Sequence, residues 1–148
     1  MKILIDEQTP VQFTASIAAG IGPAHEVVHV HDLGWSGTKD IELLKRAGSK
    51  RFDLIITNDR DQVNDPAESR AIRRSGIHHL LYPRMGGKGL SGFTLTLAAL
   101  LAALPAVLAA ITDSDNQLFI RVKKISPRPV DRIHIRDLVR NPLPYAGR

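Results

Sequence analysis

Short apolar segments alternate with helix-like segments through the first 81 residues, and this alternation restricts the possible folds more than any other feature. Strand-like runs cover residues 2–5, 25–30, 53–57 and 77–81. Helix-like stretches begin near Thr9, Thr38 and Pro66, and Thr9 is expected to cap the first helix with Pro10 as its first residue. This spacing is that of βα units, which build a parallel sheet with helices on both faces. We therefore predict a three-layer α/β/α fold with a central, mainly parallel sheet.

The remaining residues depart from this pattern. No charged residue occurs between Lys88 and Asp113, and residues 90–111 are rich in Leu and Ala. Two threonines and Pro105 argue against a membrane span, and Pro105 is expected to begin a second short helix. We predict a buried helix pair, or a helix pair that also packs on a partner subunit. Residues 118–122 and 132–136 alternate like strands, which predicts a C-terminal β-hairpin with its turn near residues 126–129.

The composition limits the cellular compartment in which the protein is expected and the kind of molecule that it is expected to bind. The chain has no cysteine, which excludes disulfide scaffolds and thiol nucleophiles. The apolar run at the N-terminus is too short for the core of a signal peptide, so we expect a cytoplasmic protein. Residues 1–65 carry ten carboxylates and seven Lys or Arg, whereas residues 66–148 carry five and thirteen. This division favours a carboxylate-lined site beside a surface that binds a polyanion.

Carboxylates gather where the predicted strands end and where a predicted helix begins. They are Asp6, Glu7, Asp40, Glu42, Asp59 and Asp61. The carboxyl ends of parallel strands meet at one edge of a sheet, and carboxylates crowded there repel one another unless a divalent cation screens them. Hard oxygen ligands suit Mg²⁺ or Mn²⁺. Such an ion polarises a phosphoryl oxygen and lowers the pKa of an attacking water.

Each carboxylate also has a plainer interpretation. Asp40 and Glu42 stand in a helical first turn, where they favour the helix dipole whatever the function. Asp61 suits a helix cap as well as a metal. If the strand continues past residue 57, Asp59 and Asp61 lie on the same side and face one ion. Asp6 is the strongest candidate together with Asp59, because a buried strand leads directly into each.

Four segments in this order resemble the PIN-like domain, and more closely its short branch related to toxins of VapC type. They are residues 4–7, 25–34, 36–40 and 54–61. The resemblance implies a PIN-like fold and a metal-dependent ribonuclease, often the toxin of a toxin–antitoxin pair. It places the acidic tetrad on Asp6, Asp40, Asp59 and Asp61, with Thr57 at the polar position that supports it. Glu7 and Glu42 are further supporting candidates from their positions beside these residues. Gln8 and Gln62 stand where this branch often carries Asn and Phe.

The resulting hypothesis is an Mg²⁺- or Mn²⁺-dependent endoribonuclease that hydrolyses RNA phosphodiester bonds. Residues 1–112 form its catalytic α/β domain, and residues 113–148 form a hairpin extension of the same domain. Basic residues of the second half are expected to bind RNA: Arg70, Arg73, Arg74, Arg84 and Lys88. The expected partners are RNA, a cognate antitoxin and a second copy of the chain, with no membrane. Two alternatives remain: a non-catalytic PIN-like interaction module and a receiver-like phosphorylation switch.

Overall fold

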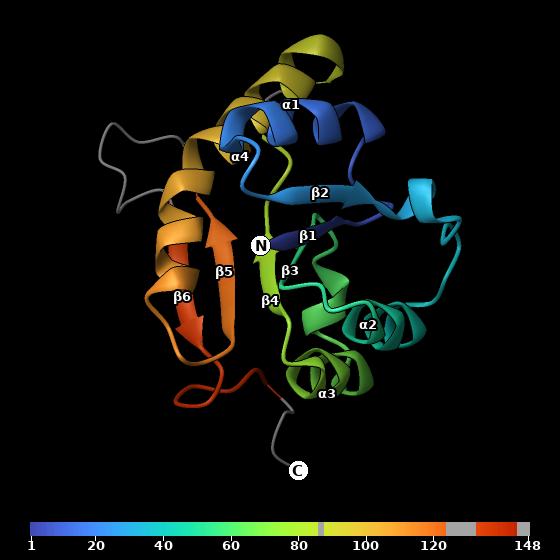
Figure 1. Cartoon of the computed structure of the whole chain (residues 1–148), viewed down its shortest axis with the longest axis vertical. Coiled ribbons are helices and arrows are strands. Elements are labelled where there is room, and N and C mark those ends of the chain that lie inside the picture. The colour runs from blue at the N-terminus through green and yellow to red at the C-terminus, as the bar shows by residue number, and fades with distance from the viewer. Residues whose placement is uncertain (86–87, 124–132, 145–148) are drawn as a thin grey trace.

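A single six-stranded sheet organises the chain (Figure 1), in a computed structural model that describes residues 1–85, 88–123 and 133–144. The spatial order of the strands is β2-β1-β3-β4-β5-β6. Their bounds are β1 Lys2–Ile5, β2 Glu26–His29, β3 Leu54–Thr57, β4 His78–Leu81, β5 Leu118–Val122 and β6 Ile133–Asp137. The first five strands are parallel, and β6 runs antiparallel to β5. The predicted parallel sheet and terminal hairpin are confirmed; the predicted turn at residues 126–129 lies outside the described residues.

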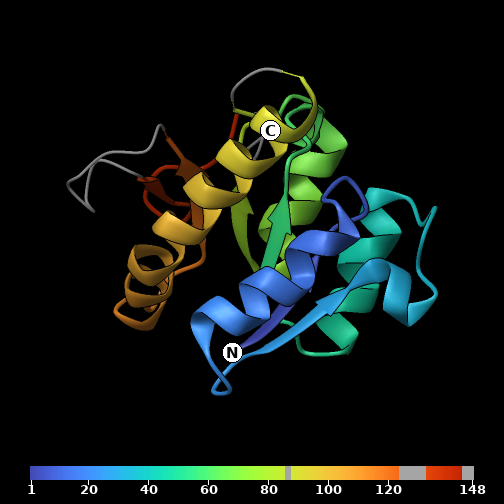
Figure 2. The ribbon, with the colours of Figure 1, turned by 90° about the horizontal axis from the view of Figure 1, so that it is seen from above.

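Helices cover both faces of the sheet, as the view in Figure 2 makes clear. Their bounds are α1 Val11–Ile21, α2 Asp40–Ser49, α3 Pro66–Ser75 and α4 Gly89–Thr112, with 3₁₀ turns η1 Val30–Leu33 and η2 Asp61–Val63. Helices α1 and α4 pack on one face, and α2 and α3 pack on the other. The arrangement is the three-layer α/β/α fold expected from the alternation of segments.

The two central strands, β1 and β3, are mainly apolar on both faces because both faces are covered. In β1, Ile3 and Ile5 belong to the core beneath α1 and α4, whereas Leu4 belongs to the core beneath α2 and α3. Successive side chains of a strand point to opposite faces, so a strand buried between two layers must be apolar throughout. This burial leaves the ends of the strands as the place where polar side chains can gather.

The turn between β1 and α1 differs from the expected helix cap. Helix α1 begins at Val11, and Pro10 precedes it without any side-chain capping bond. Thr9 is instead buried: its backbone N–H donates to the Asp6 carbonyl at 3.0 Å, and its Oγ1 accepts the Tyr82 hydroxyl at 2.8 Å. The prediction that Thr9 caps α1 is therefore wrong, because its hydroxyl ties this turn to the segment after β4.

Helix α4 is continuous through Pro105, so the predicted pair of short helices is also wrong. Pro105 lies on the exposed side, while Leu100, Leu104 and Val107 are fully buried against the sheet. One unbroken apolar stripe packed on the sheet holds the helix together across the missing N–H of the proline. Among the described helices, α4 alone is long and apolar enough to span a membrane by length and composition; here its inner face forms part of the core.

Candidate active site at the carboxyl edge of the sheet

The crevice between the ends of β1 and β3 is the topological switch point of the sheet. The chain leaves β1 toward the face of α1, and it leaves the adjacent β3 toward the opposite face, where α3 packs. Parallel α/β proteins bind ligands in such a crevice because the two departing segments leave it open. Asp6 directly follows β1, and Asp59 stands two residues beyond β3.

Asp6 is a buried carboxylate held in a fixed orientation. It is 4% exposed; its Oδ2 accepts the Thr57 hydroxyl at 2.7 Å, and its Oδ1 accepts the Glu7 N–H at 2.7 Å. The Thr57 Oγ1 also accepts the Asp59 N–H at 3.0 Å. The Thr57 hydroxyl thus links the segment of Asp6, after β1, to the segment of Asp59, after β3. Burial raises the pKa of Asp6, and the charges of Asp59 and Glu7 add to this effect, while the two hydrogen bonds oppose it.

Asp40 reaches the same crevice from the first residue of α2. Its Oδ1 accepts the Gln62 amide Nε2–H at 3.1 Å. Burial raises the pKa of Asp40, and the negative charges of Asp6 and Asp59 raise it further. Gln62, noted in the sequence only as a departure from the family pattern, is buried and orients this carboxylate.

Glu68 is a fourth carboxylate of the site, and the sequence interpretation missed it. Burial raises its pKa, and the charge of Asp40 raises it next. The carboxyl groups of Asp40 and Glu68 are close enough to share a hydrogen bond when one is protonated. Glu68 occupies the first turn of α3, where its N–H donates to the capping Asp65 at 2.8 Å. The Asp-x-x-Glu spacing of Asp65 and Glu68 is typical of a helix cap, so the sequence gives no sign that the Glu68 side chain also belongs to the acidic site.

These carboxylates line one open pocket of about 380 Å³. Asp6, Glu7, Asp40, Asp59 and Glu68 all contribute to its wall. Glu7 is exposed, and its Oε2 accepts the Gly37 N–H at 2.7 Å, which ties the loop before α2 to the end of β1. Three of the four tetrad residues proposed from the sequence therefore meet in space.

Asp61, the fourth, lies in an adjoining pocket and not beside Asp40. Strand β3 ends at Thr57, and the chain turns so that Asp59 Oδ1 accepts the Asp61 N–H at 2.9 Å where η2 begins. The expectation that Asp59 and Asp61 share one side of a continuing strand is wrong. Asp61 is exposed and lines, together with Asp59, an open pocket of about 630 Å³. Glu42 is exposed outside both pockets and pairs with Arg46 at 3.2 Å.

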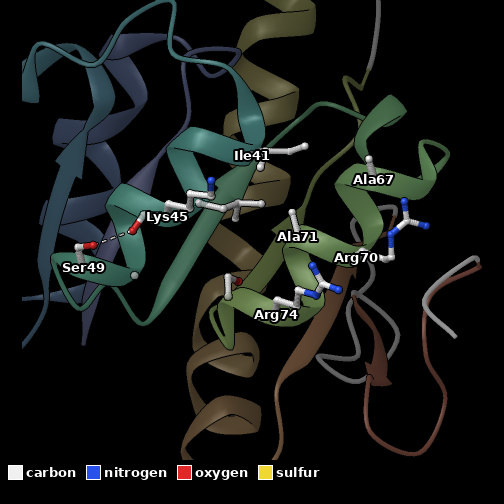
Figure 3. A pocket seen from close by; sticks show the side chains of 10 residues that line it. Ile41, Lys45, Ser49, Ala67, Arg70, Ala71 and Arg74 are labelled. Atoms are coloured by element: carbon white, nitrogen blue, oxygen red, sulfur yellow. Dashed lines mark hydrogen bonds between the residues drawn. The ribbon is translucent and has the colours of Figure 1, made fainter. Parts of the chain in front are cut away.

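The predicted RNA-binding residues separate into two groups. Arg84 lines the pocket of Asp59 and Asp61, and with Lys88 it also lines a neighbouring apolar cavity. Arg70 and Arg74 instead line a groove of about 470 Å³ between α2 and α3, with Lys45 on the facing helix (Figure 3). Arg73 is exposed on the same helix but does not line the groove. Ile41 lines both this groove and the acidic pocket, so the two hollows adjoin.

The donor set fits a hard divalent cation. Mg²⁺ binds through one or two carboxylates and keeps several waters. Burial raises the pKa of Asp6, Asp40 and Glu68 most, and the repulsion between their charges, which raises it further, is what such an ion relieves. Within residues 1–85, 88–123 and 133–144, no three His, Asp or Glu side chains are arranged to ligate one ion together. A cation held by two carboxylates and completed by water is the arrangement these residues allow.

The fold and the acidic pocket define an α/β protein with a carboxylate-lined site at its switch point. Comparison with known families agrees: a family model described as PIN-like domain matches residues 1–84. The match covers more than half of the 148 residues, so the chain belongs to the PIN-like domain family, whose members are commonly nucleases. No curated protein and no solved structure matches the chain.

Proposed function

We propose that this protein is a metal-dependent endoribonuclease that hydrolyses RNA phosphodiester bonds. One observation carries the proposal: carboxylates from four separate segments line a single pocket at the switch point, where burial and then their mutual repulsion raise the pKa of Asp6, Asp40 and Glu68. Packing so much negative charge together opposes folding, so its presence at a ligand-binding position favours a function that needs it. The PIN-like family supports nuclease chemistry at this place.

Asp6 and Asp40 are the residues we assign to Mg²⁺ or Mn²⁺, with Asp59 and Glu68 acting directly or through water. A bound ion of this kind supplies a polarised phosphoryl oxygen and a water of lowered pKa. Thr57 and the Glu7 N–H keep the Asp6 carboxylate in one orientation, and Gln62 does the same for Asp40. Such fixed ligands need no rearrangement during the reaction.

Hydrolysis joins a water oxygen to phosphorus and breaks the bond from phosphorus to the leaving ribose oxygen. The attacking water must lose a proton, and the leaving oxygen must gain one. Glu68 is suited to hold the first proton, because burial and then the neighbouring charge of Asp40 raise its pKa, and solvent water supplies the proton that the leaving oxygen gains. The Arg84 guanidinium, on the side of Asp59, is placed to bind a phosphate oxygen of the strand.

The basic residues suggest how the strand is held on either side of the pocket. Arg84 lines the pocket of Asp59, and Lys88 lines the cavity next to it. The groove of Arg70 and Arg74 opens near Asp40. Four residues along an α-helix advance about 6 Å, so Arg70 and Arg74 offer two successive cationic contacts. We propose that RNA passes across the acidic pocket between these two groups, with Arg73 adding charge at the surface.

An RNA cleavage assay with and without added Mg²⁺ or Mn²⁺ tests this function. We expect Asp6→Asn and Asp40→Asn to lower the cleavage rate by more than about 100-fold, beyond the 10–100-fold typical of residues that only support a ligand. Glu42→Gln is the matched control, because it removes a carboxylate from the same helix as Asp40 but outside the pocket. Cleavage by Asp6→Asn at the parent rate would overturn the proposal.

The wider biological role follows from the resemblance to toxins of VapC type. We propose that the enzyme acts in the cytoplasm as the toxin of a toxin–antitoxin pair, restrained by a cognate antitoxin protein. Expression of the parent chain should arrest growth, and Asp6→Asn should not. An arrest of equal strength by both chains would contradict a toxin that acts through RNA cleavage. The receiver-like alternative requires phosphorylation at Asp59, and the PIN-like family match favours the nuclease over it.

The outward face of α4 favours a second candidate, an interaction module. Leu90 is 78% exposed and Leu95 is 41% exposed on a helix without any charged residue. We propose that this face packs against a second copy of the chain. Light scattering after size exclusion should report a dimer for the parent and a monomer for Leu95→Lys. A monomeric parent would eliminate this candidate and leave the nuclease proposal unchanged.

A further inference from the structure

An aromatic cavity of about 540 Å³ adjoins the acidic site at the end of β4. It is lined by three of the seven aromatic residues of the chain: Phe13 from α1, Tyr82 after β4 and Phe93 from α4. The rings of Phe13 and Phe93 are 4.9 Å apart at 71°, and those of Phe13 and Tyr82 are 6.3 Å apart. Three elements thus build one cluster of flat apolar surfaces around a hollow.

Two of the three rings are buried in the protein, and the third is open to the cavity. Phe13 and Tyr82 are each 1% exposed, whereas Phe93 is partly exposed. The Tyr82 hydroxyl donates to Thr9, and the Thr96 hydroxyl bonds to both the N–H and the carbonyl of Met85. These two hydroxyls are satisfied within the protein. The groups left to contact a ligand are the partly exposed ring of Phe93 and the side chains of Asn58, Arg84 and Lys88.

Cationic side chains connect this cavity to the carboxylates. Arg84 and Lys88 line it, and none of its lining residues carries a negative charge. Arg84 and Asn58 also line the pocket of Asp59 and Asp61, so the two hollows share a wall. Asn58, with its amide oriented to satisfy both neighbours, donates to the Gln8 carbonyl and accepts the Arg84 Nε–H, each at 3.3 Å.

We propose that the aromatic cavity binds one nucleobase of the RNA strand, next to the phosphate that reaches the acidic site. This inference rests on the proposed ribonuclease function. Ring surfaces bind any base by stacking, and a nearby cation binds the phosphate attached to it. The cavity has an aromatic ring, cationic residues at its border and a wall shared with the carboxylates. These features fit a base with its phosphate better than they fit an uncharged apolar side chain of a protein partner.

Binding of single-stranded RNA in EDTA tests the cavity separately from cleavage. Oligonucleotides carrying 5-iodouridine at one position each are crosslinked to the parent protein, and the attached residues are identified by mass spectrometry. We expect one position of the strand to crosslink to Phe93 or its neighbours in the cavity. Crosslinks confined to residues outside the cavity would overturn the proposal.

Variants of Phe93 give the matching affinity measurement. Phe93→Leu keeps an apolar side chain but removes the ring, and we expect it to weaken RNA binding by about tenfold, as for the loss of one stacked base. Phe93→Tyr should bind as the parent does. Thr94→Ala, which changes an exposed side chain on the same helix outside the cavity, is the control. Equal affinity of Phe93→Leu and the parent would refute the base site.

The two proposals fail in different ways. If Asp6→Asn cleaves RNA at the parent rate while Phe93→Leu binds poorly and the crosslinks lie in the cavity, the base site stands and the assigned chemistry is wrong. If cleavage depends on Asp6 but Phe93→Leu binds RNA normally, the nuclease stands and the base site is wrong. Binding of an apolar protein segment that Phe93→Leu abolishes, without any RNA crosslink in the cavity, also counts against the base site.

Discussion

Replacing Thr57 by valine isolates the hydroxyl that joins the two central carboxylate segments. The substitution keeps the shape of a β-branched side chain in a buried strand and removes only the hydroxyl. It takes away the 2.7 Å bond to the Asp6 carboxylate and leaves the Asp59 N–H without its partner at 3.0 Å. A hydrogen bond to a charged group contributes about 1.5–3 kcal/mol and one between neutral groups about 1 kcal/mol. We expect the free energy of unfolding to fall by about 2.5–4 kcal/mol at pH 7.

The pH dependence of this loss identifies its cause. The Thr57 hydroxyl lowers the pKa of Asp6, so its removal raises that pKa further. At low pH the Asp6 carboxyl is protonated in both proteins, and the missing bond is then one between neutral groups. The difference in stability between parent and Thr57→Val should therefore shrink as the pH falls through the Asp6 pKa.

Urea unfolding followed by tryptophan fluorescence measures this difference. The single tryptophan, Trp35, packs edge-on against the buried Phe52 with ring centroids 6.3 Å apart, so unfolding changes its surroundings. Thr112→Val is the control, because that hydroxyl bonds only to a carbonyl of its own helix at an exposed position. A Thr57→Val protein within about 0.5 kcal/mol of the parent at pH 7 would refute the reasoning. The same variant should cleave RNA about 10–100-fold more slowly, as expected for a residue that orients a metal ligand.

Three further predictions concern the charges of the site. Because the pKa values of Asp6, Asp40 and Glu68 are raised, the folded protein binds more protons than the unfolded chain, and its stability should fall as the pH rises above their ordinary pKa values of 3.8–4.5. In thermal melts, Asp40→Asn should make this fall in stability with pH shallower, and an unchanged slope would contradict the prediction. Mn²⁺ should raise the melting temperature of the parent protein but not of Asp6→Asn; an equal rise in both would exclude Asp6 as a ligand. Arg74→Ala should weaken RNA binding and reduce its salt dependence by about one unit of slope, whereas Arg46→Ala, paired with Glu42 outside the groove, should not; identical salt slopes would remove Arg74 from the interface.

Much of the fold was predictable because its signals are local. Strands buried on both faces must be apolar where they are buried, and residues 3–5 and 54–56 show that property. Alternation with helix-like stretches then predicts a parallel sheet. At Pro105 the local sequence gives the wrong prediction, because packing of α4 along the sheet outweighs the preference of a proline to begin a helix.

The candidate site was predictable where a strand leads directly into a carboxylate. Asp6 and Asp59 were found for that reason, and Asp40 was found through its place at the start of α2. Glu68 was not, because its Asp-x-x-Glu spacing has a sufficient local explanation as a helix cap. Asp61 was expected in the same pocket on the assumption of a longer strand, and the chain turns before reaching it.

The order of residues by itself determined the class of fold, the edge of the sheet where charge collects and the type of chemistry that oxygen ligands allow. Backbone periodicity and the chemical identity of side chains are properties of the chain before it folds. The tertiary structure alone decided which carboxylates share a pocket, which arginines lie near it and which aromatic rings form the adjoining cavity. Those groupings join residues as far apart as Thr9 and Tyr82, or Asp40 and Glu68, and only the packing of helices on the sheet sets such distances.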